Sequence, residues 1–363
     1  VGPMTFFAHR GLAFFVLSSS NRESDITAVA EEFFGRNAGI AITCLYFLAI
    51  YPILLVYGVS LTNTVESFLI HQLGLSSPPR ILLSGICVGT FITIILVGEK
   101  AVLAFNEKLT YPLCTILLGL SFYLMPHWHL SSFQAIPTAK SLLETLWVTL
   151  PVLVFAFNHS PAISTFAVSQ RAEYGDEAER KASTTLCATS GILVLFVMFF
   201  VFSCVLSLSP EKLAEANQQN ISILSYLANH FNNPLLAYLG PLIAFLAIST
   251  SFFGHYLGAR EGLNGLIVKA NRNAPLHSTK RERGIALFFF VTIWIAAINN
   301  PSVLDIIEDL AGPVIVMILF IMPMIAIAKV PAMKKYKGRL SNIFVTLLGL
   351  VTITSLIASL LGF

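Results

Sequence analysis

The sequence predicts an all-α membrane protein that crosses the bilayer many times. Of its 363 residues, 56% are hydrophobic and only 11% are charged, whereas about a quarter of the residues of a soluble domain are charged. Apolar runs long enough to cross a bilayer as helices recur along the whole chain. Because so few charges cannot cover a soluble globule of this size, lipid is expected to surround much of the surface. We treat residues 1–363 as a single transmembrane domain.

A helical span needs about 20 apolar residues, and by this criterion nine full spans are expected after a short apolar segment at Gly2–Val16. They are Ala38–Leu61, Ile81–Val97, Ala101–Leu124, Leu142–Phe157 with a broken continuation to about Val168, Ser183–Leu208, Leu235–Leu257, Gly284–Ile298, Ala311–Ile327 and Asn342–Leu361.

The basic residues support this division, because nearly all of the 22 Lys and Arg residues fall in alternate connections. Only Arg80, Lys140 and Lys212 lie in the other set, and Lys108 lies within a span. A missed span would mix the two sets. We call the richer side the basic side. The positive-inside rule predicts that it is cytoplasmic and that the C-terminus faces outward.

Two connections are expected to contain helices. Ser24–Phe34 has apolar residues at helical spacing opposite acidic ones, which predicts a helix on the basic side, along the membrane or against the bundle. On the opposite side, Ser209 and Pro210 form a helix start with a capping Ser and Pro at the first helical position. Leu224, Leu227, Ala228 and Phe231 give its continuation an apolar face.

The stretch LPVLVFAFNHSPAISTFA, Leu150–Ala167, places Asn158, His159, Ser160 and Pro161 inside an apolar run. Pro161 has no N–H to donate and clashes with the carbonyl four residues earlier. In lipid every backbone polar group needs a partner, so a broken helix at this depth is tolerated where it lines a cavity. Secondary transporters build binding sites from such discontinuous helices. The alternative is a proline kink in which Asn158 and Ser160 join neighbouring helices; the four residues together favour a binding site.

A second polar cluster lies in FLAISTSFFGHYLGAREG, Phe245–Gly262. Ala247, Thr250 and Ser251 have i, i+3, i+4 spacing and share a helical face. Two hydroxyls and a carbonyl suit a hard cation or a proton-linked water. Close helix packing through small residues explains the same pattern equally well.

Tyr51 and Tyr57 lie within the first full span and are candidates to close over a solute, or are packing residues. Other classes of membrane protein lack support in the sequence. We find no repeated filter sequence of a channel, no long soluble connection of a receptor, and no HExxH or nucleophile elbow of an enzyme.

The strings PMTFFAHRGL, YPILLVYGVSLTNTVESFL, FAFNHSPAISTFAVSQRAEYG, FFGHYLGAREGL and AGPVIVMILFIMPM resemble the hydroxy and aromatic amino acid permease family. The chain is most similar to its serine and threonine permeases, over essentially its whole length. The resemblance implies the leucine-transporter-like architecture of the amino acid–polyamine–cation superfamily, an inverted-repeat helix bundle whose first and sixth helices are broken at the substrate. The chain is expected to lack the family's first helix and part of the second.

The resemblance further implies site residues. The broken sixth helix corresponds to Leu142–Val168, unwound at Phe157–Pro161, so Phe157, Asn158, His159 and Ser160 are expected at the substrate. Tyr51 and Tyr57 belong to the third helix, which flanks it. Ala247, Thr250 and Ser251 match eighth-helix positions that help to hold an ion in sodium-coupled relatives.

The function expected from the sequence is therefore import of a hydroxy amino acid of the serine or threonine type by proton symport in a bacterial inner membrane. The alternatives are an aromatic (tryptophan or tyrosine) permease and a sodium-coupled symporter. His159 is either a proton carrier, because imidazole titrates near neutrality, or a neutral hydrogen-bonding residue. We expect no cofactor, no resident metal, no enzymatic activity, no nucleic-acid partner and no obligate protein partner.

Overall fold

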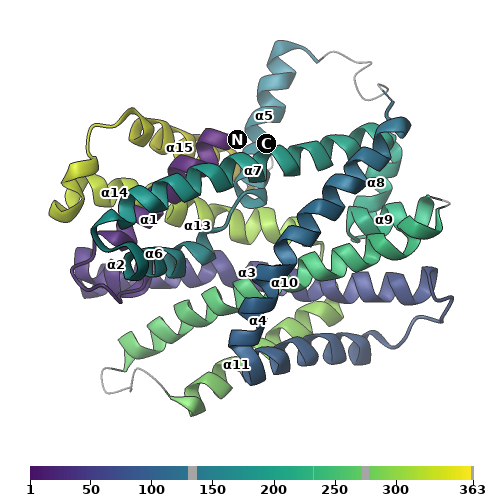
Figure 1. The fold of residues 1–363 in the computed structure, drawn as a ribbon, viewed down its shortest axis with the longest axis horizontal. Helices are drawn as coiled ribbons and strands as arrows, with labels where there is room; N and C mark the ends of the chain where they lie inside the picture. The colour runs from purple at the N-terminus through teal and green to yellow at the C-terminus, as the bar shows by residue number, and fades with distance from the viewer. Residues whose placement is uncertain (130–136, 232, 272–277, 361–363) are drawn as a thin grey trace.

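The computed structural model describes residues 1–129, 137–231, 233–271 and 278–360, which form helices joined by short connections (Figure 1). Within those ranges, nine segments are long and apolar enough to cross a membrane; each overlaps an expected span, and Ser160–Ser207 also includes the expected continuation of the broken span to about Val168. They are Arg36–His71 (α3), Arg80–Gly98 and Lys100–His127 (the halves of α4, Arg80–Leu124, with η1, Met125–His127), Ala139–Ala156 (α5), Ser160–Ser207 (α6, Ser160–Tyr174, and α7, Ala178–Ser207), Pro234–Ala270 (α10), Thr279–Asn299 (α11), Gly312–Lys329 (α13 to α14) and Leu340–Ala358 (within α15, Leu340–Leu360).

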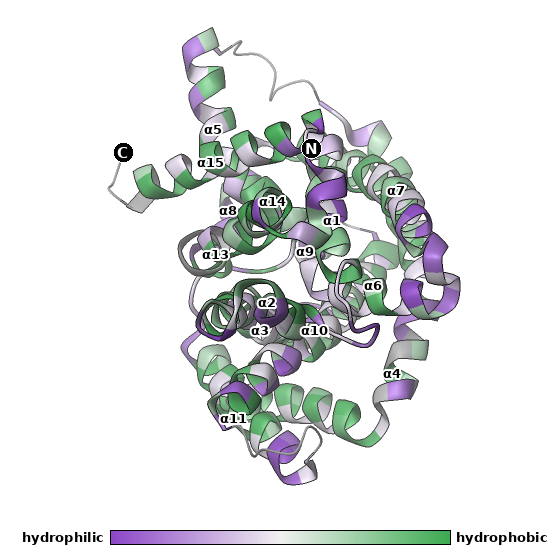
Figure 2. Ribbon diagram, turned by 90° about the vertical axis from the view of Figure 1, so that its left-hand side faces the viewer, coloured by the Kyte–Doolittle hydropathy of each residue, from purple (hydrophilic) through white to green (hydrophobic). Residues whose placement is uncertain are grey.

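This arrangement confirms the predicted all-α polytopic class, whereas the inverted repeat stays a prediction. Figure 2 shows apolar residues along most of the long helices and many hydrophilic residues at their ends and in the connections. Leu361, the expected end of the last span, lies outside the described residues.

Several elements depart from regular α-helix. The two spans of α4 meet at Gly98, whose φ of −149° and ψ of 50° are not helical. The segment before α15 contains two π-helical turns, η4 (Ile306–Ala311) and η5 (Met317–Ile321), between the α-helical pieces α12 (Val303–Asp305), α13 (Gly312–Val316) and α14 (Met322–Lys329). Two further 3₁₀ turns are η3 (Gly175–Glu177) and η6 (Pro331–Tyr336).

The apolar segment at the start of the chain forms α1 (Gly2–Leu17), which is largely buried against α6, α7 and α14. The expected basic-side helix is α2 (Ile26–Phe34), capped by the Asp25 side chain, which accepts from the Ala28 N–H. Its apolar face is buried, and α2 packs against α3, α1 and α10. Of the two expected placements, the structure therefore shows the one against the bundle.

On the opposite side, Ser209 caps α8 (Pro210–Gln218) as predicted, by accepting from the Lys212 N–H. The expected continuation is a separate helix, α9 (Ile223–His230). The chain reverses between them at Asn220, which has a left-handed φ of 53° that asparagine tolerates better than most residues.

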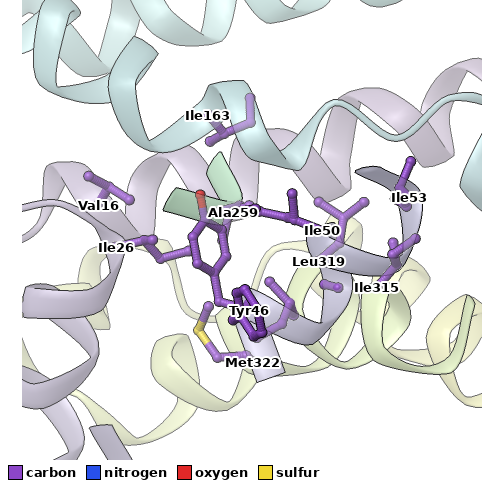
Figure 3. Packing of buried hydrophobic residues seen from close by; sticks show 14 of the residues in the cluster. Val16, Ile26, Tyr46, Ile50, Ile53, Ile163, Ala259, Ile315, Leu319 and Met322 are labelled. Carbon is purple, nitrogen blue, oxygen red and sulfur yellow. The ribbon is translucent and has the colours of Figure 1, made fainter. Parts of the chain in front are cut away.

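The helices α3 and α10 make the most extensive contact of any helix pair, and both run through the middle of the molecule (Figure 1). Tyr46 of α3 is fully buried between α2, α6, α10 and the α13–α14 segment, among Ile26, Ile163, Ala259 and Leu319 (Figure 3). Close packing of this kind holds α3 and α10 as one unit.

Both helices are longer than the spans expected from hydropathy. The apolar run of α10 ends near Leu257, but the helix continues to Ala270, and no proline lies between these two residues. Arg260 and Glu261, which the span boundaries assign to a connection, therefore lie on α10 itself.

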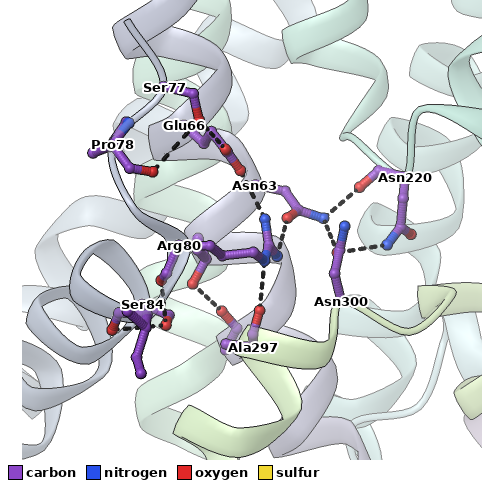
Figure 4. A network of polar contacts seen from close by, with 12 residues as sticks. Asn63, Glu66, Ser77, Pro78, Arg80, Ser84, Asn220, Ala297 and Asn300 are labelled. Atoms are coloured by element: carbon purple, nitrogen blue, oxygen red, sulfur yellow. Dashed lines mark hydrogen bonds and ion pairs between the residues drawn. The ribbon is translucent and has the colours of Figure 1, made fainter.

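On the opposite side, a polar network joins the ends of α3, α4 and α11 to the turn between α8 and α9 (Figure 4). Arg80, at the start of α4, donates to Glu66 (2.7 Å), to the Asn63 Oδ1 (2.6 Å) and to the carbonyl of Ala297 (2.7 Å). The Asn63 Nδ2 donates to the Asn300 Oδ1 (2.9 Å). Because Arg80 and Glu66 are only 22% and 21% exposed, their ion pair is far better shielded than a surface pair.

We expect Arg80→Met to lower the melting temperature of the detergent-solubilised protein, because it leaves a half-buried carboxylate and a carbonyl without their donor, at a cost on the order of 2 kcal/mol. The control is Arg180→Met, which breaks an exposed pair with Glu177 on α7 and should change stability very little. Equal melting temperatures for the two variants would contradict the structural role of the network.

Candidate substrate site at the helix break

The predicted helix break is present, and it is shorter than expected. The α5 helix ends at Ala156 and α6 begins at Ser160, so Phe157, Asn158 and His159 are the non-helical residues. The Asn158 Oδ1 accepts from the Ser160 N–H (3.0 Å), and the His159 Nδ1 lies 3.1 Å from the Phe157 carbonyl. Pro161 occupies the first turn of α6, where a missing N–H costs nothing.

A second histidine, which the sequence analysis did not single out, holds the break in place. His9 of α1 stacks on His159 with ring centroids 3.5 Å apart, and its Nε2 accepts the backbone N–H of His159 (3.1 Å). The His9 Nδ1 lies 2.7 Å from the Thr5 carbonyl, so Nδ1 carries the proton and the imidazole is neutral. The only signal for His9 in the sequence was an imidazole in an apolar run.

Three polar groups at the break are buried and have no hydrogen-bond partner among the described residues: the Asn158 Nδ2, the His159 Nε2 and the Ser160 Oγ. Buried polar groups in proteins are nearly always hydrogen-bonded, and each one that is not costs about 1–3 kcal/mol. Two of these groups, the Asn158 Nδ2 and the His159 Nε2, belong to residues that line the cavity described next, which indicates a place suited to a polar solute.

A cavity of about 850 Å³ lies beside the break. Its wall combines the break residues Asn158 and His159 with residues of α3, α10 and α11. It extends along α6 and α10 as far as Glu282 in the first turn of α11, near the basic side. Phe157 and Ser160 are buried behind this wall and do not line it.

The two tyrosines of α3 have different surroundings. Tyr57 lines the cavity, and its ring lies edge-on to His255 of α10 at 5.0 Å. The ring of Tyr51 packs against Phe47, Phe288 and Phe289, and Tyr51 is not part of the cavity wall. Six residues along an α-helix correspond to a rotation of roughly 240°, so the two rings point in different directions.

The three expected ion-coupling residues are likewise separated. Ser251 lines the cavity. The Thr250 hydroxyl instead donates to the Ala247 carbonyl (2.9 Å), and the Thr250 carbonyl accepts from Asn106 of α4 (3.4 Å). Their role in ion coupling stays a prediction, and only Ser251 is in a position to contact a solute in the cavity. No cluster of His, Cys, Asp or Glu suited to a metal occurs among the described residues.

Glu261 of α10 also lines the cavity, and its Oε1 accepts from the Ser164 hydroxyl of α6 (2.9 Å). It lies beyond the end of the span expected from hydropathy. The signal for it was the absence of proline between Leu257 and Ala270.

The α10 helix approaches the break through a glycine. A Cβ added to Gly258 would lie 3.0 Å from the Pro161 Cβ and 3.2 Å from the Ile50 Cδ1. We expect Gly258→Ala to lower the melting temperature, at a cost of about 1–2 kcal/mol for overpacking against a rigid proline.

Gly254, one turn earlier on α10, has open space around its added Cβ. Gly254→Ala should keep or raise the melting temperature, because alanine favours helix. If Gly258→Ala proves as stable as Gly254→Ala, the close approach of α10 to α6 is not a constraint on the fold.

Comparison with known proteins gives this geometry a context. The sequence pattern of the tryptophan/tyrosine permease family matches residues 3–359. The serine transporter SdaC of Escherichia coli K12 is 55% identical over 366 residues, which is 99% of this chain and 85% of the relative. The threonine/serine transporter TdcC of Yersinia enterocolitica is 39% identical over 99% of this chain and 87% of its own length. These relatives are transporters, so the protein is a membrane transporter and not an enzyme. Together they show that the chain belongs to the tryptophan/tyrosine permease family, on the branch of its serine and threonine transporters.

Proposed function

We propose that the protein imports a hydroxy amino acid, serine or threonine, by symport with a proton across a bacterial inner membrane. The observation that carries the proposal is the set of unpaired polar groups at the helix break, beside a cavity that α3, α10 and α11 complete. The names of the serine and threonine transporters that resemble the chain support the choice of substrate.

The groups at the break complement an amino acid. The N-terminus of α6 carries the positive end of the helix dipole, and the Asn158 Nδ2 is a donor, so both attract the carboxylate. The C-terminal end of α5 carries the negative end and attracts the ammonium group. Because the His159 Nδ1 is paired with the Phe157 carbonyl, its Nε2 is left as an acceptor. Tyr57 and Ser251, across the cavity, are suited to the substrate hydroxyl.

Transport requires this cavity to open alternately to the two sides. The contacts divide the molecule accordingly: α3 and α10 pack as one unit, and the α5–α6 pair meets that unit through small residues such as Gly258. Rocking of the broken helix against this unit would open and close the site. By the positive-inside rule, we place the basic side in the cytoplasm and the C-terminus in the periplasm.

The test is uptake by the purified protein in proteoliposomes, with labelled serine, threonine and tryptophan under imposed proton or sodium gradients. Serine and threonine should accumulate when the exterior is acidic, and a protonophore should abolish the accumulation. Uptake of tryptophan alone would favour an aromatic permease, stimulation by sodium alone would favour sodium coupling, and no stimulation by either gradient would rule out symport.

The two tyrosines of α3 provide a matched pair for the substrate site. Tyr57→Phe should raise the KM for serine by about tenfold, the equivalent of one lost hydrogen bond of about 1.4 kcal/mol. Tyr51→Phe removes the same atom from the same helix outside the cavity wall and should leave KM unchanged. The assignment of Tyr57 is wrong if the two variants transport serine with the same KM.

A further inference from the structure

Glu261 lies where three elements that are distant in sequence meet. Its Oε1 accepts from the Ser164 hydroxyl of α6 (2.9 Å), and the Ser164 Oγ in turn accepts the backbone N–H of Ile26, the first residue of α2 (3.0 Å). Ser164 is buried, with 1% of its surface exposed. This short relay is therefore a direct polar connection between α10, the second half of the broken helix and the basic-side helix α2.

The direction of the hydrogen bonds depends on the charge of Glu261. Because the Ile26 N–H donates to Ser164, the single hydroxyl proton of Ser164 is available for Glu261. A hydrogen bond to a carboxylate is roughly twice as strong as one to a neutral group. The relay therefore holds α6 and α2 to α10 most firmly when Glu261 is charged, and protonation weakens it.

The α10 helix contacts its neighbours through glycines on both sides of Glu261. A Cβ added to Gly262 would lie 3.1 Å from the Phe47 Cα of α3, and one added to Gly265 would lie 2.9 Å from the Thr27 Oγ1 of α2. Gly258 is in similarly close contact with Pro161. At these positions α10 is therefore tightly packed against its neighbours. Any movement of α6 relative to α10 must therefore change the surroundings of Glu261.

Other ionisable groups face Glu261 from the elements around it. In the described part of the chain they are Asp25 of α2, Tyr46 of α3, Arg260 beside it on α10 and, around the cavity, His159, His255 and Glu282. Asp25 is engaged as the cap of α2, where its Oδ1 accepts from Ala28 and from the Thr27 hydroxyl. Figure 3 shows the hydroxyl of Tyr46 directed toward Ala259 of α10, and that hydroxyl is buried and has no hydrogen-bond partner in the described part of the chain.

A carboxylate suits proton transport in this cavity better than the imidazoles do. On binding a proton, Glu261 becomes neutral, whereas His159 or His255 would become a cation between apolar helices. A zwitterionic amino acid carries no net charge. A site that holds both the substrate and a protonated Glu261 therefore carries no net charge from either of them. Glu282 is exposed and lies in the first turn of α11, at the end of the cavity near the basic side.

From these contacts we propose that Glu261 is the carboxylate that carries the coupled proton, and that the Ser164–Glu261 hydrogen bond is a latch which its protonation loosens. The inference rests on the proposed proton symport. The carboxylate takes one proton while the cavity is open to the outer side, the weakened latch lets α6 separate from α10 toward the basic side, and the proton leaves there with the substrate.

The decisive variant is Glu261→Gln, which mimics the protonated acid and cannot release a proton. A gradient of one pH unit supplies about 1.4 kcal/mol and supports roughly tenfold accumulation of serine by the unmodified protein in proteoliposomes. We expect Glu261→Gln to accumulate none and to lose serine-induced proton uptake, while it still exchanges labelled for unlabelled serine at equal pH. The control is Glu173→Gln, the same change at an exposed residue of α6 that lies outside the cavity wall, which should retain all three activities.

Gradient-driven accumulation by Glu261→Gln would overturn the proposal, and so would the loss of exchange while serine still raises its melting temperature. A failure of the unmodified protein to move protons would instead reject the proposed symport itself. If Glu261→Gln does not fold, Glu261→Asp decides: accumulation with a displaced pH profile supports the proposal, and an unchanged profile overturns it.

Ser164→Ala tests the latch separately. Without the donor from Ser164 the charged form of Glu261 is less stabilised, so half-maximal uptake should move to higher pH, on the order of one pH unit. A lower rate with an unchanged pH profile would mean that Ser164 has only a structural role.

Discussion

The rule that a peptide group inside a membrane must find a partner determines how this molecule is built. Between α5 and α6 the helical hydrogen bonds stop, and neighbouring side chains pair the N–H groups there: the Asn158 Oδ1 accepts from the Ser160 N–H, and the His9 Nε2 accepts from the His159 N–H. Among the described residues, the side-chain atoms that lack a partner at the break include the Asn158 Nδ2 and the His159 Nε2, whose residues line the cavity. The N–H groups of the break are thus paired within the protein, while these side-chain groups are left for a solute.

The contact between His9 and His159 makes α1 part of the site. The imidazole of His9 both stacks on His159 and accepts its N–H, so the position of the broken helix depends on a helix that is far away in sequence. The basic-side helix α2 has a comparable role toward α10: Lys269 pairs with Glu31 at one end, and the relay through Ser164 meets Glu261 at the other. Two segments outside the nine long spans, α1 and α2, therefore contact the broken helix, and α2 also contacts α10.

The opposite side is joined differently. There Arg80, Glu66 and three asparagines connect α3, α4, α11 and the turn between α8 and α9 in one polar network (Figure 4). It holds the ends of the α3 and α11 helices, whereas the relay on the basic side consists of a few bonds that converge on one carboxylate. This contrast fits the proposed movement of α6 at the basic side, during which the opposite-side ends of α3 and α11 stay in place.

The sequence by itself determined the number and order of the spans, the basic-side charge bias, the cap at Ser209, and the helix break, because each depends on local composition or on one residue such as Pro161. It did not separate Tyr57 from Tyr51 or Ser251 from Thr250, since the side that a membrane helix turns to a cavity depends on its neighbours, and all sides are apolar. It also ended α10 near Leu257, because hydropathy marks where lipid ends and not where hydrogen bonds end. Only the tertiary structure brought His9 to His159 and Ser164 to Glu261, since those pairs are separated by 150 and 97 positions and arise from packing.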